Sequence, residues 1–271
     1  MSAPVRFGTV VLTGATSGIG EATARRLAAR ADRLVLLGPQ PEAEVAAALA
    51  GIRDAGPARV AYVAADFTRL ADVVPAARAV RALAPRIDLL INDAGVPGAP
   101  ERMLTADGFE RTLQVNALAP ALFTRLLIPA MASGGRVVNV GSSAHRVERF
   151  DFADPDLAHG YTPTAAYCRA KLAMVTWSSL LAEEEAHGSV EVVALCPGLS
   201  DTALSAAMMG RIGGPPDRGA QRVLYAATAR VPSGSYLEGD EPTAPSSEVR
   251  DPGNRRRLVE LFTARLTPFA A

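Results

Sequence analysis

The stretch Thr13-Gly14-Ala15-Thr16-Ser17-Gly18-Ile19-Gly20 follows a short apolar run, Thr9–Leu12, and opens a helical segment. Glycine is needed where a backbone turns sharply or lies directly against a phosphate group. The backbone N–H groups of such a loop, together with the first turn of the following helix, bind an anion such as a pyrophosphate. A plain tight turn is the alternative interpretation, but the order of strand, loop and helix favours a nucleotide-binding loop.

Short apolar runs and longer helical segments alternate from this loop to about residue 200. Runs this uniformly apolar are typical of strands buried on both faces. Their regular alternation with helices predicts an α/β doubly wound parallel sheet, the Rossmann fold, in one domain over residues 1–271. The expected strands are Thr9–Leu12, Arg33–Leu37, Arg59–Ala64, Leu89–Asn92, Gly135–Val140 and Val190–Leu195, and the expected helices are Ile19–Ala29, Glu42–Ala55, Arg69–Ala84, Gly108–Met131 and Thr164–His187.

The sequence changes character after residue 200. Residues 200–217 mix apolar with flexible residues, and we expect them to form a C-terminal lid over a substrate pocket. A helix over Arg218–Ala229 and a short strand around Tyr236 should follow. Residues 239–254, rich in Pro, Ser and acidic side chains, should form a surface loop before a last helix, Arg255–Leu266.

The composition indicates a well-packed globular protein. Of the 271 residues, 49% are hydrophobic and 21% charged, and 28 basic and 28 acidic side chains give a net charge of zero. No basic excess points to nucleic acid as a partner, and we expect neither a membrane span nor a signal peptide. The two cysteines match no disulfide framework and no zinc site, so we expect no metal and a reduced, cytoplasmic setting.

Tyr167 and Lys171 stand four residues apart and share one face of an expected helix. An ammonium group beside a phenol favours the phenolate, so we expect Lys171 to lower the pKa of Tyr167 from its usual value of about 10. Such a tyrosine can donate and accept a proton near neutral pH, as the interconversion of carbonyls and alcohols requires. The spacing alone is weak evidence, because it arises by chance in many helices.

The chain carries, in this order, Thr13-Gly14-x-x-x-Gly18-x-Gly20, Asn92-Asp93-Ala94-Gly95, Asn116, Ser142, Tyr167-x-x-x-Lys171 and Pro197-Gly198. This series resembles the short-chain dehydrogenase/reductase family over nearly the whole chain. The stretch from Ser142 to Tyr167 is longer than in the shortest family members, and its insert, His145–Thr164, is similar to that of the retinol-dehydrogenase-like branch. The resemblance implies an oxidoreductase that transfers a hydride between NAD(P) and a carbonyl or alcohol group.

The resemblance also implies a role for each candidate site residue. Tyr167 is the general acid, Ser142 hydrogen-bonds the substrate oxygen, and Ser143 stays an alternative to it. Lys171 binds the nicotinamide ribose, and Asn116 holds a water that links Lys171 to solvent. The implied cofactor-binding residues are Gly14, Thr16, Ser17, Gly18, Ile19, Gly20, Asp66, Phe67, Asn92, Ala94, Gly95, Tyr167, Lys171, Pro197, Gly198 and Thr202.

Three residues depart from the family pattern at the cofactor end. Asp93 replaces an asparagine, and a buried carboxylate there must be paired or protonated. Gly38 stands where an acid would accept from the 2′-hydroxyl of NAD, and Pro39 where an arginine would hold the 2′-phosphate of NADP. Because no acid repels a phosphate, we expect NADP rather than NAD, with a degraded adenosine site as a third interpretation.

Three functions stay open on the sequence alone. The first is a carbonyl reductase or alcohol dehydrogenase acting on an apolar small molecule, with bacterial secondary metabolism suggested by the Ala- and Arg-rich composition. The second keeps the fold without net redox chemistry, as a dehydratase, epimerase or cyclase. The third is a nucleotide sensor, against which the complete set of proton-transfer residues argues.

Substrate contacts and association can be predicted only coarsely. Helices Gly108–Met131 and Thr164–His187 could join copies into a homodimer or homotetramer, or simply cover the sheet. Core packing explains each candidate for an apolar substrate pocket equally well. These candidates are His145, Phe150, Phe152, Tyr161, Met208 and Met209.

Overall fold

One sheet of eight strands runs through the part of the protein that the computed structural model describes, residues 5–188 and 190–269. The strand order is β3-β2-β1-β4-β5-β6-β7-β8, and all neighbours pair in parallel except β7 and β8. Successive strands are added on one side of β1 up to β3 and on its other side from β4 onward. Between β1 and β4, where this order turns around, doubly wound sheets form a crevice for a ligand. The strands are β1 (Phe7–Thr13), β2 (Ala31–Gly38), β3 (Arg59–Ala64), β4 (Ile87–Asn92), β5 (Met131–Val140), β6 (Glu191–Cys196), β7 (Tyr236–Glu238) and β8 (Glu241–Pro242).

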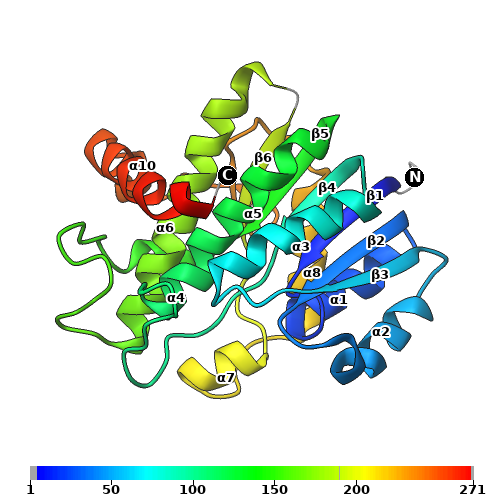
Figure 1. The fold of residues 1–271 in the computed structure, drawn as a ribbon, viewed down its shortest axis with the longest axis horizontal. Coiled ribbons are helices and arrows are strands. Elements are labelled where there is room, and N and C mark those ends of the chain that lie inside the picture. Colours follow the sequence, from blue (N-terminus) through cyan, green and yellow to red (C-terminus); the bar gives the residue numbers. More distant parts are fainter. Residues whose placement is uncertain (1–4, 189, 270–271) are drawn as a thin grey trace.

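Helices cover both faces of the sheet (Figure 1). One apolar layer includes α3, α5, α6 and α10, and the other includes α1, α2 and α8. Short 3₁₀ turns lie at Glu42–Val45, Ile128–Ala130, Ser143–Arg146, Glu185–His187 and Thr267–Phe269. The α-helices are α1 (Gly18–Ala28), α2 (Ala46–Arg53), α3 (Leu70–Leu83), α4 (Arg111–Leu113), α5 (Ala119–Leu127), α6 (Pro163–Glu184), α7 (Ala203–Met209), α8 (Pro216–Thr228), α9 (Ser247–Arg250) and α10 (Pro252–Leu266).

The predicted doubly wound parallel sheet is confirmed, and each predicted strand lies inside an observed strand or within one residue of it. The predicted helix Gly108–Met131 was too long at both ends. It begins at Arg111, because the carboxylate of Glu110 caps it by accepting from the N–H groups of Thr112 and Leu113. It passes through a π-helical turn and ends at Leu127, before a 3₁₀ turn and β5.

Residues 239–254, predicted as a surface loop, contain β8 and α9. Helix α10 also begins inside this segment, at Pro252, because Asp251 caps it by accepting from the N–H of Asn254 at 2.8 Å. Val249 of α9 is buried in the core, so the segment is anchored to the domain rather than loosely attached.

The helical stretch Arg111–Ala130 has the length and hydropathy of a membrane span, although 78% of its apolar window is buried inside the protein. It packs between the sheet, α3 and α6. Burial on this scale identifies it as a core helix of the α/β domain.

A buried polar network joins the carboxyl ends of β4 and β5 to the helices that cover them. The Asn92 amide donates to Asn139 Oδ1 at 2.7 Å and to the Thr124 hydroxyl of α5 at 2.9 Å. The Asn139 amide donates in turn to the Ser178 hydroxyl of α6 at 2.6 Å. Each of these bonds replaces a hydrogen bond to water that the polar group loses when it is buried. The network therefore fixes the strand ends on which the site is built.

Replacing Asn139 with Leu should lower the free energy of unfolding by about 1–3 kcal/mol, because it leaves the Asn92 amide and the Ser178 hydroxyl buried without this partner. Urea denaturation followed by the fluorescence of the single tryptophan, the buried Trp177, would measure the loss. Ser178→Ala removes one bond of the network and should cost less. An Asn139→Leu protein as stable as the wild type would contradict this account.

Candidate active site

The glycine loop lies directly against the end of β4. Gly14 and Gly18 have φ angles of 71° and 56°, which glycine adopts without strain. A Cβ atom on Gly14 would stand 2.8 Å from the backbone nitrogen of Ala94, and one on Gly20 would stand 2.1 Å from the carbonyl oxygen of Gly14. The hydroxyl of Thr13, given no role in the sequence interpretation, accepts from the Ala94 N–H at 3.1 Å and ties β1 to β4.

The first turn of α1 packs against α8 through a side chain and leaves its backbone N–H groups for an anion. Ser17 precedes the helix in an extended conformation, and its hydroxyl makes no capping bond. The Ile19 side chain packs toward α8, where a Cβ atom on Gly219 would stand 2.8 Å from its Cδ1. Ile19 therefore anchors the start of α1 on α8 through its side chain. The backbone N–H groups of this first turn are the groups suited to an anion.

The packing at the adenosine end explains why residue 38 is glycine. A Cβ atom there would stand 2.9 Å from the Tyr62 hydroxyl and 3.1 Å from Thr16 Oγ1. Tyr62, which the sequence interpretation missed, also donates to the carbonyl oxygen of Gln40 at 2.8 Å. Its hydroxyl and that of Thr16 occupy the space that an acidic residue 38 would need.

Three residues predicted at the cofactor use their side chains elsewhere. Asp66 accepts from both the N–H and the hydroxyl of Thr68, at 2.9 and 2.8 Å. The ring of Phe67 is buried against Phe123, with 5.8 Å between ring centroids. The Asn92 amide belongs to the buried network. Phe67 and Asn92 can therefore meet a cofactor only through their backbone atoms.

The other side of the crevice is formed by the chain after β6. The Pro197 carbonyl accepts from Arg222 of α8 at 2.8 Å. Gly198 has a φ of 77°, and a Cβ atom on it would collide with the Arg222 guanidinium at 1.8 Å. Thr202 caps α7, and its Cγ2 lies 3.2 Å from the Cβ position of Gly18. The structure thus brings Thr202 against the glycine loop, and Arg222, which the sequence interpretation missed, supports Pro197 and Gly198.

A dinucleotide fits this arrangement. The glycines let the loop pack tightly against β4 and its own helix, where a Cβ atom would clash, and the start of α1 offers N–H groups to a pyrophosphate. Beyond the loop, a Cβ atom on Gly95 would stand 3.4 Å from Asn116 Oδ1 and 3.8 Å from Lys171 Nζ. A cofactor that lies along Gly14 and Gly95 therefore ends beside the catalytic candidates.

Ser142, Tyr167 and Lys171 meet at the carboxyl end of β5. Ser142 follows this strand, and its Oγ accepts from the Ala144 N–H at 3.2 Å. Tyr167 and Lys171 lie on α6, where the ammonium is 5.7 Å from the centroid of the phenol ring. The Lys171 ammonium donates to the carbonyl oxygen of Val140 at 2.7 Å. The structure therefore brings the three predicted side chains together.

Asn116 lies on the π-helical turn Gln114–Leu118, between α4 and α5. Such turns widen a helix locally and occur often at functional sites. The Asn116 amide holds both backbone groups of Val96, accepting from the N–H at 2.8 Å and donating to the carbonyl at 2.9 Å. Its side chain thus fixes the loop after β4, and the predicted water beside Lys171 stays a prediction.

The predicted net lowering of the Tyr167 pKa below its usual value was wrong. Burial raises the pKa of Tyr167 to about 12, and a hydrogen bond from Ser142 only partly offsets this effect. Burial also lowers the pKa of Lys171 to about 8, against the opposing charge of Asp93. At neutral pH Tyr167 is therefore a protonated phenol, which is the form that donates a proton.

His145 is buried against the turn that carries Ser142 and does not line a substrate pocket. Its ring is fully buried, with Nδ1 2.6 Å from the Ser142 carbonyl oxygen. Nε2 accepts from the Ser246 N–H at 3.1 Å, so Nδ1 carries the proton and donates to Ser142. The ring also packs edge-on against Tyr236, with 4.8 Å between centroids. Neutral His145 thus joins the Ser142 turn to the segment before α9.

The other residues predicted to line a substrate pocket fall into two groups, aromatic residues that pack inside the protein and methionines on α7. Phe150 and Phe152 pack on each other at 4.7 Å and face α6, α9 and α10. Tyr161 donates to the Ala99 carbonyl at 2.8 Å. For these aromatic residues the packing interpretation holds, whereas Met208 and Met209 lie on α7 beside the crevice.

Acidification should destabilise the protein through His145. Burial lowers its pKa, and an imidazolium cannot accept from the Ser246 N–H. The stability that the neutral ring contributes is complete above the unfolded-state pKa of about 6.5 and is lost as the pH falls through the lower folded-state pKa. Between about pH 7 and about pH 5 the Tm should fall more steeply for the wild type than for His145→Gln.

The matched control is His159→Gln, because the His159 side chain is 93% exposed. This variant should keep the wild-type dependence of Tm on pH. Parallel curves for the wild type and His145→Gln would show that His145 does not carry the effect.

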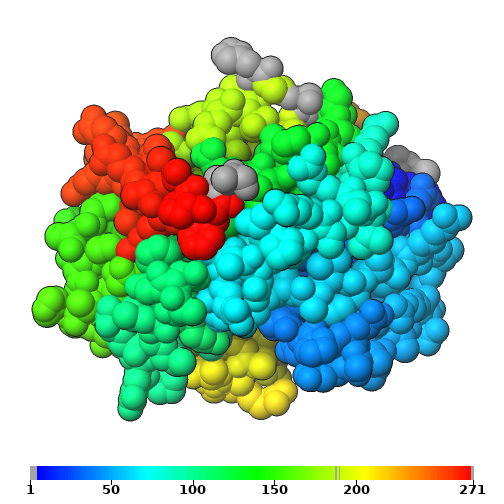
Figure 2. Space-filling model, viewed as in Figure 1, coloured from blue at the N-terminus to red at the C-terminus, as the bar shows by residue number. Residues whose placement is uncertain are grey.

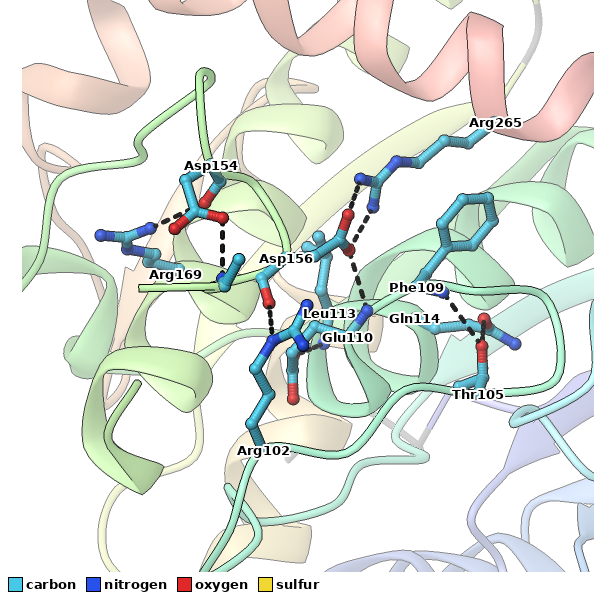
Figure 3. Close-up of polar contacts among 11 residues, drawn as sticks. Arg102, Thr105, Phe109, Glu110, Leu113, Gln114, Asp154, Asp156, Arg169 and Arg265 are labelled. Atoms are coloured by element: carbon cyan, nitrogen blue, oxygen red, sulfur yellow. Dashed lines mark hydrogen bonds and ion pairs between the residues drawn. The ribbon is translucent and has the colours of Figure 1, made fainter. Parts of the chain in front are cut away.

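An ion-pair network fastens the segment before α6 to the C-terminal helix (Figure 3). Asp156 pairs with both terminal nitrogens of Arg265 and accepts from the Glu110 N–H at 2.8 Å. The Asp156 carbonyl accepts from Arg102 at 2.8 Å, and the Arg265 guanidinium lies 4.4 Å from the centroid of the Phe109 ring. Figure 3 shows Arg265 reaching from α10 toward Asp156, so α10, the segment before α6 and the start of α4 share one anchor.

Replacing Arg265 with Met should lower the free energy of unfolding by about 1–3 kcal/mol, because the side chains of Arg265 and Asp156 are only 9% and 22% exposed. The matched control is Arg6→Met, which breaks a pair with Asp32 whose side chains are 56% and 66% exposed. It should cost less than about 1 kcal/mol. Equal losses in urea denaturation would contradict a buried anchor.

The sequence matches the short chain dehydrogenase family over residues 8–210. Polyprenol dehydrogenase of Mus musculus is 36% identical over 271 residues, covering 92% of this chain and 80% of that protein. Retinol dehydrogenase 13 of Mus musculus is 35% identical over 272 residues, covering 92% and 81%. The crystal structure of a short chain dehydrogenase from Burkholderia cenocepacia J2315 in complex with NADP has a TM-score of 0.71 at 26% identity and covers 88% of this chain and 98% of that one.

The chain therefore belongs to the short-chain dehydrogenase/reductase family, in its retinol-dehydrogenase-like branch. The resemblance seen in the sequence is confirmed. Membership makes the protein an oxidoreductase that acts on a CH–OH or C=O group.

Proposed function

We propose that the protein transfers a hydride between a nicotinamide cofactor and the carbonyl or alcohol group of an apolar small molecule, with Tyr167 as general acid or base. The convergence of the glycine loop with Ser142, Tyr167 and Lys171 carries this proposal. When bound, the nicotinamide supplies or takes up the hydride. The protein residues hold the substrate oxygen and move its proton.

Each residue has a distinct part in that proton transfer. The hydroxyls of Ser142 and Tyr167 hold the substrate oxygen, and the protonated phenol donates to the alkoxide that develops there. Lys171, with a pKa of about 8, is largely charged at neutral pH and favours the phenolate that donation leaves behind. In alcohol oxidation the same groups work in reverse, and Tyr167 accepts the proton.

Exposed apolar side chains around α7 support an apolar substrate. Leu199, Met209 and Ile212 are 49%, 54% and 41% exposed, in a segment that touches the glycine loop through Thr202. Figure 2 shows this segment in yellow at the edge of the molecule, between the teal and blue parts of the chain. We propose that residues 200–217 form the lid of the substrate site. The names of the two mouse relatives, for polyprenol and retinol, also favour an apolar alcohol or its carbonyl form.

NADP is the proposed cofactor, with NAD as the alternative. The NADP complex of the Burkholderia cenocepacia relative supports NADP, as does the absence of an acid at Gly38. The groups that surround Gly38 are the uncharged hydroxyls of Thr16 and Tyr62, and Glu42 is the charged residue that acts on Tyr62. Because residue 39 is proline rather than a basic residue that would hold a 2′-phosphate, discrimination between the two cofactors should be small.

The two cysteines support a reducing location. Cys168 and Cys196 are both buried free thiols. Thiols persist where glutathione keeps the compartment reduced, so we propose a cytoplasmic setting.

Replacing Tyr167 with Phe tests the proposed function. It removes the proton donor and keeps the shape of the ring, so the reduction of apolar ketones and aldehydes with NADPH or NADH should fall by about 10²–10⁴-fold. Cofactor consumption measures the rate, and the rise in Tm on adding cofactor should persist. Tyr225→Phe, at an exposed tyrosine, is the matched control and should keep full activity.

Three results would change the assignment. Retained reduction by Tyr167→Phe would remove Tyr167 from the reaction. Substrate turnover by the wild type without net consumption of NADPH or NADH would support a dehydratase, epimerase or cyclase instead. A nucleotide at 100 times its Kd adds about 2.7 kcal/mol of stability, so no rise in Tm with either nucleotide would contradict cofactor binding itself.

A further inference from the structure

Asp93 lies where the glycine loop, β4 and the catalytic helix α6 meet. Its backbone N–H donates to the Thr13 hydroxyl at 3.2 Å. Its carboxylate oxygen Oδ2 stands 2.7 Å from the point that a Cβ atom on Gly20 would occupy, against the first turn of α1. The carboxylate therefore lies at the positive end of the helix that would hold a pyrophosphate.

Few groups compensate the charge of this carboxylate. It makes no hydrogen bond or ion pair of its own within residues 5–188 and 190–269. From α6, Lys171 and Tyr167 face it, and the Cys196 thiol at the end of β6 acts on both of those groups. The neighbouring parts of β1 and α1 contribute the uncharged Thr13 and Gly20, while Glu21 of α1 is paired with Arg25.

An ionised Asp93 and a pyrophosphate would compete for the same helix start. Both are anions, and because Asp93 is half-buried, repulsion between them is stronger than it would be in bulk water. Burial raises the pKa of Asp93 to about 7, even though the charge of Lys171 opposes the shift. Both protonation states of Asp93 are therefore present near neutral pH, and they differ in their compatibility with an anionic ligand.

We infer that Asp93 controls dinucleotide binding through its protonation state. The protein binds the dinucleotide with a neutral Asp93 carboxyl, and a molecule whose Asp93 is ionised takes up one proton from solvent as it binds. The neutral carboxyl resembles the amide of asparagine in shape and can donate a hydrogen bond. This inference rests on the proposed function, because it concerns how the same site accepts its cofactor.

Two measurements on the wild type and Asp93→Asn test the inference. The first is the Kd of NADPH and of NADH from about pH 5.5 to about pH 9. Wild-type affinity should fall by up to about tenfold per pH unit above the titration of Asp93, and Asp93→Asn should lose this part of the dependence. The second is proton uptake on binding, from calorimetry in buffers of different ionisation enthalpy. We expect up to one proton near pH 8 for the wild type and less for Asp93→Asn.

Two control variants separate Asp93 from its surroundings. Asp32→Asn makes the same chemical change at an exposed residue that pairs with Arg6, and it should keep the wild-type dependence on pH. Lys171→Met removes a second group that titrates in this range and retains Asp93, so proton uptake should persist in it and move to higher pH, because the Lys171 charge lowers the pKa of Asp93.

The outcomes are distinct. If wild type and Asp93→Asn bind with the same dependence on pH, or if the wild type takes up no proton, the inference is overturned while cofactor binding stands. The proton-uptake measurement needs only the wild type, so it decides even if Asp93→Asn does not fold. If the wild type binds neither NADPH nor NADH at any pH, the proposed function fails and the inference fails with it.

Discussion

The contact between the ends of β1 and β4 is the constraint on which the rest of the site depends. Thr13 accepts from the N–H groups of Asp93 and Ala94, and Gly14 comes so close to Ala94 that no side chain fits between them. This contact places the glycine loop beside the chain that leads to Gly95. Because Gly95 lies next to Asn116 and Lys171, the same contact brings the glycine loop near the side chains proposed to move the proton.

Burial sets the charge of the site. It raises the pKa values of Tyr167 and Asp93 and lowers those of Lys171 and His145, so all four groups shift toward their neutral forms. Of these groups Lys171, with a pKa of about 8, still carries a positive charge at neutral pH, and the backbone N–H groups at the start of α1 are suited to an anion. A phenol with a raised pKa suits the role proposed for Tyr167, which is to hold a proton until an alkoxide forms.

Local sequence patterns predicted the strands and the place of the glycine loop well, because each depends on residues close together in the chain. Strand β3 was predicted at both ends from its composition, and the glycine loop from its spacing. Contacts between distant residues were not predictable in the same way. His145 meets Ser246, and Asp156 meets Arg265, only because the last part of the chain returns to cover α6.

The pKa of Tyr167 illustrates the same limit. Spacing showed that Lys171 shares its helical face, but not that the ammonium donates to the Val140 carbonyl, that Lys171 is buried or that Tyr167 is half-buried. Similarly, the sequence showed that residue 38 lacks an acid, while only the structure shows that Tyr62 and Thr16 fill the space around it. The pKa of a side chain, and the size of side chain that a position can hold, depend on residues that are distant in the sequence and close in space.

Deuterium transfer tests the central claim most directly. The wild type would be given an apolar ketone and NADPH or NADH carrying deuterium at C4 on the transferred face, and the product would be analysed by mass spectrometry. The account predicts one deuterium on the carbinol carbon of the product alcohol. A product formed without deuterium, with the cofactor unchanged, would contradict hydride transfer and show that the fold serves a different reaction.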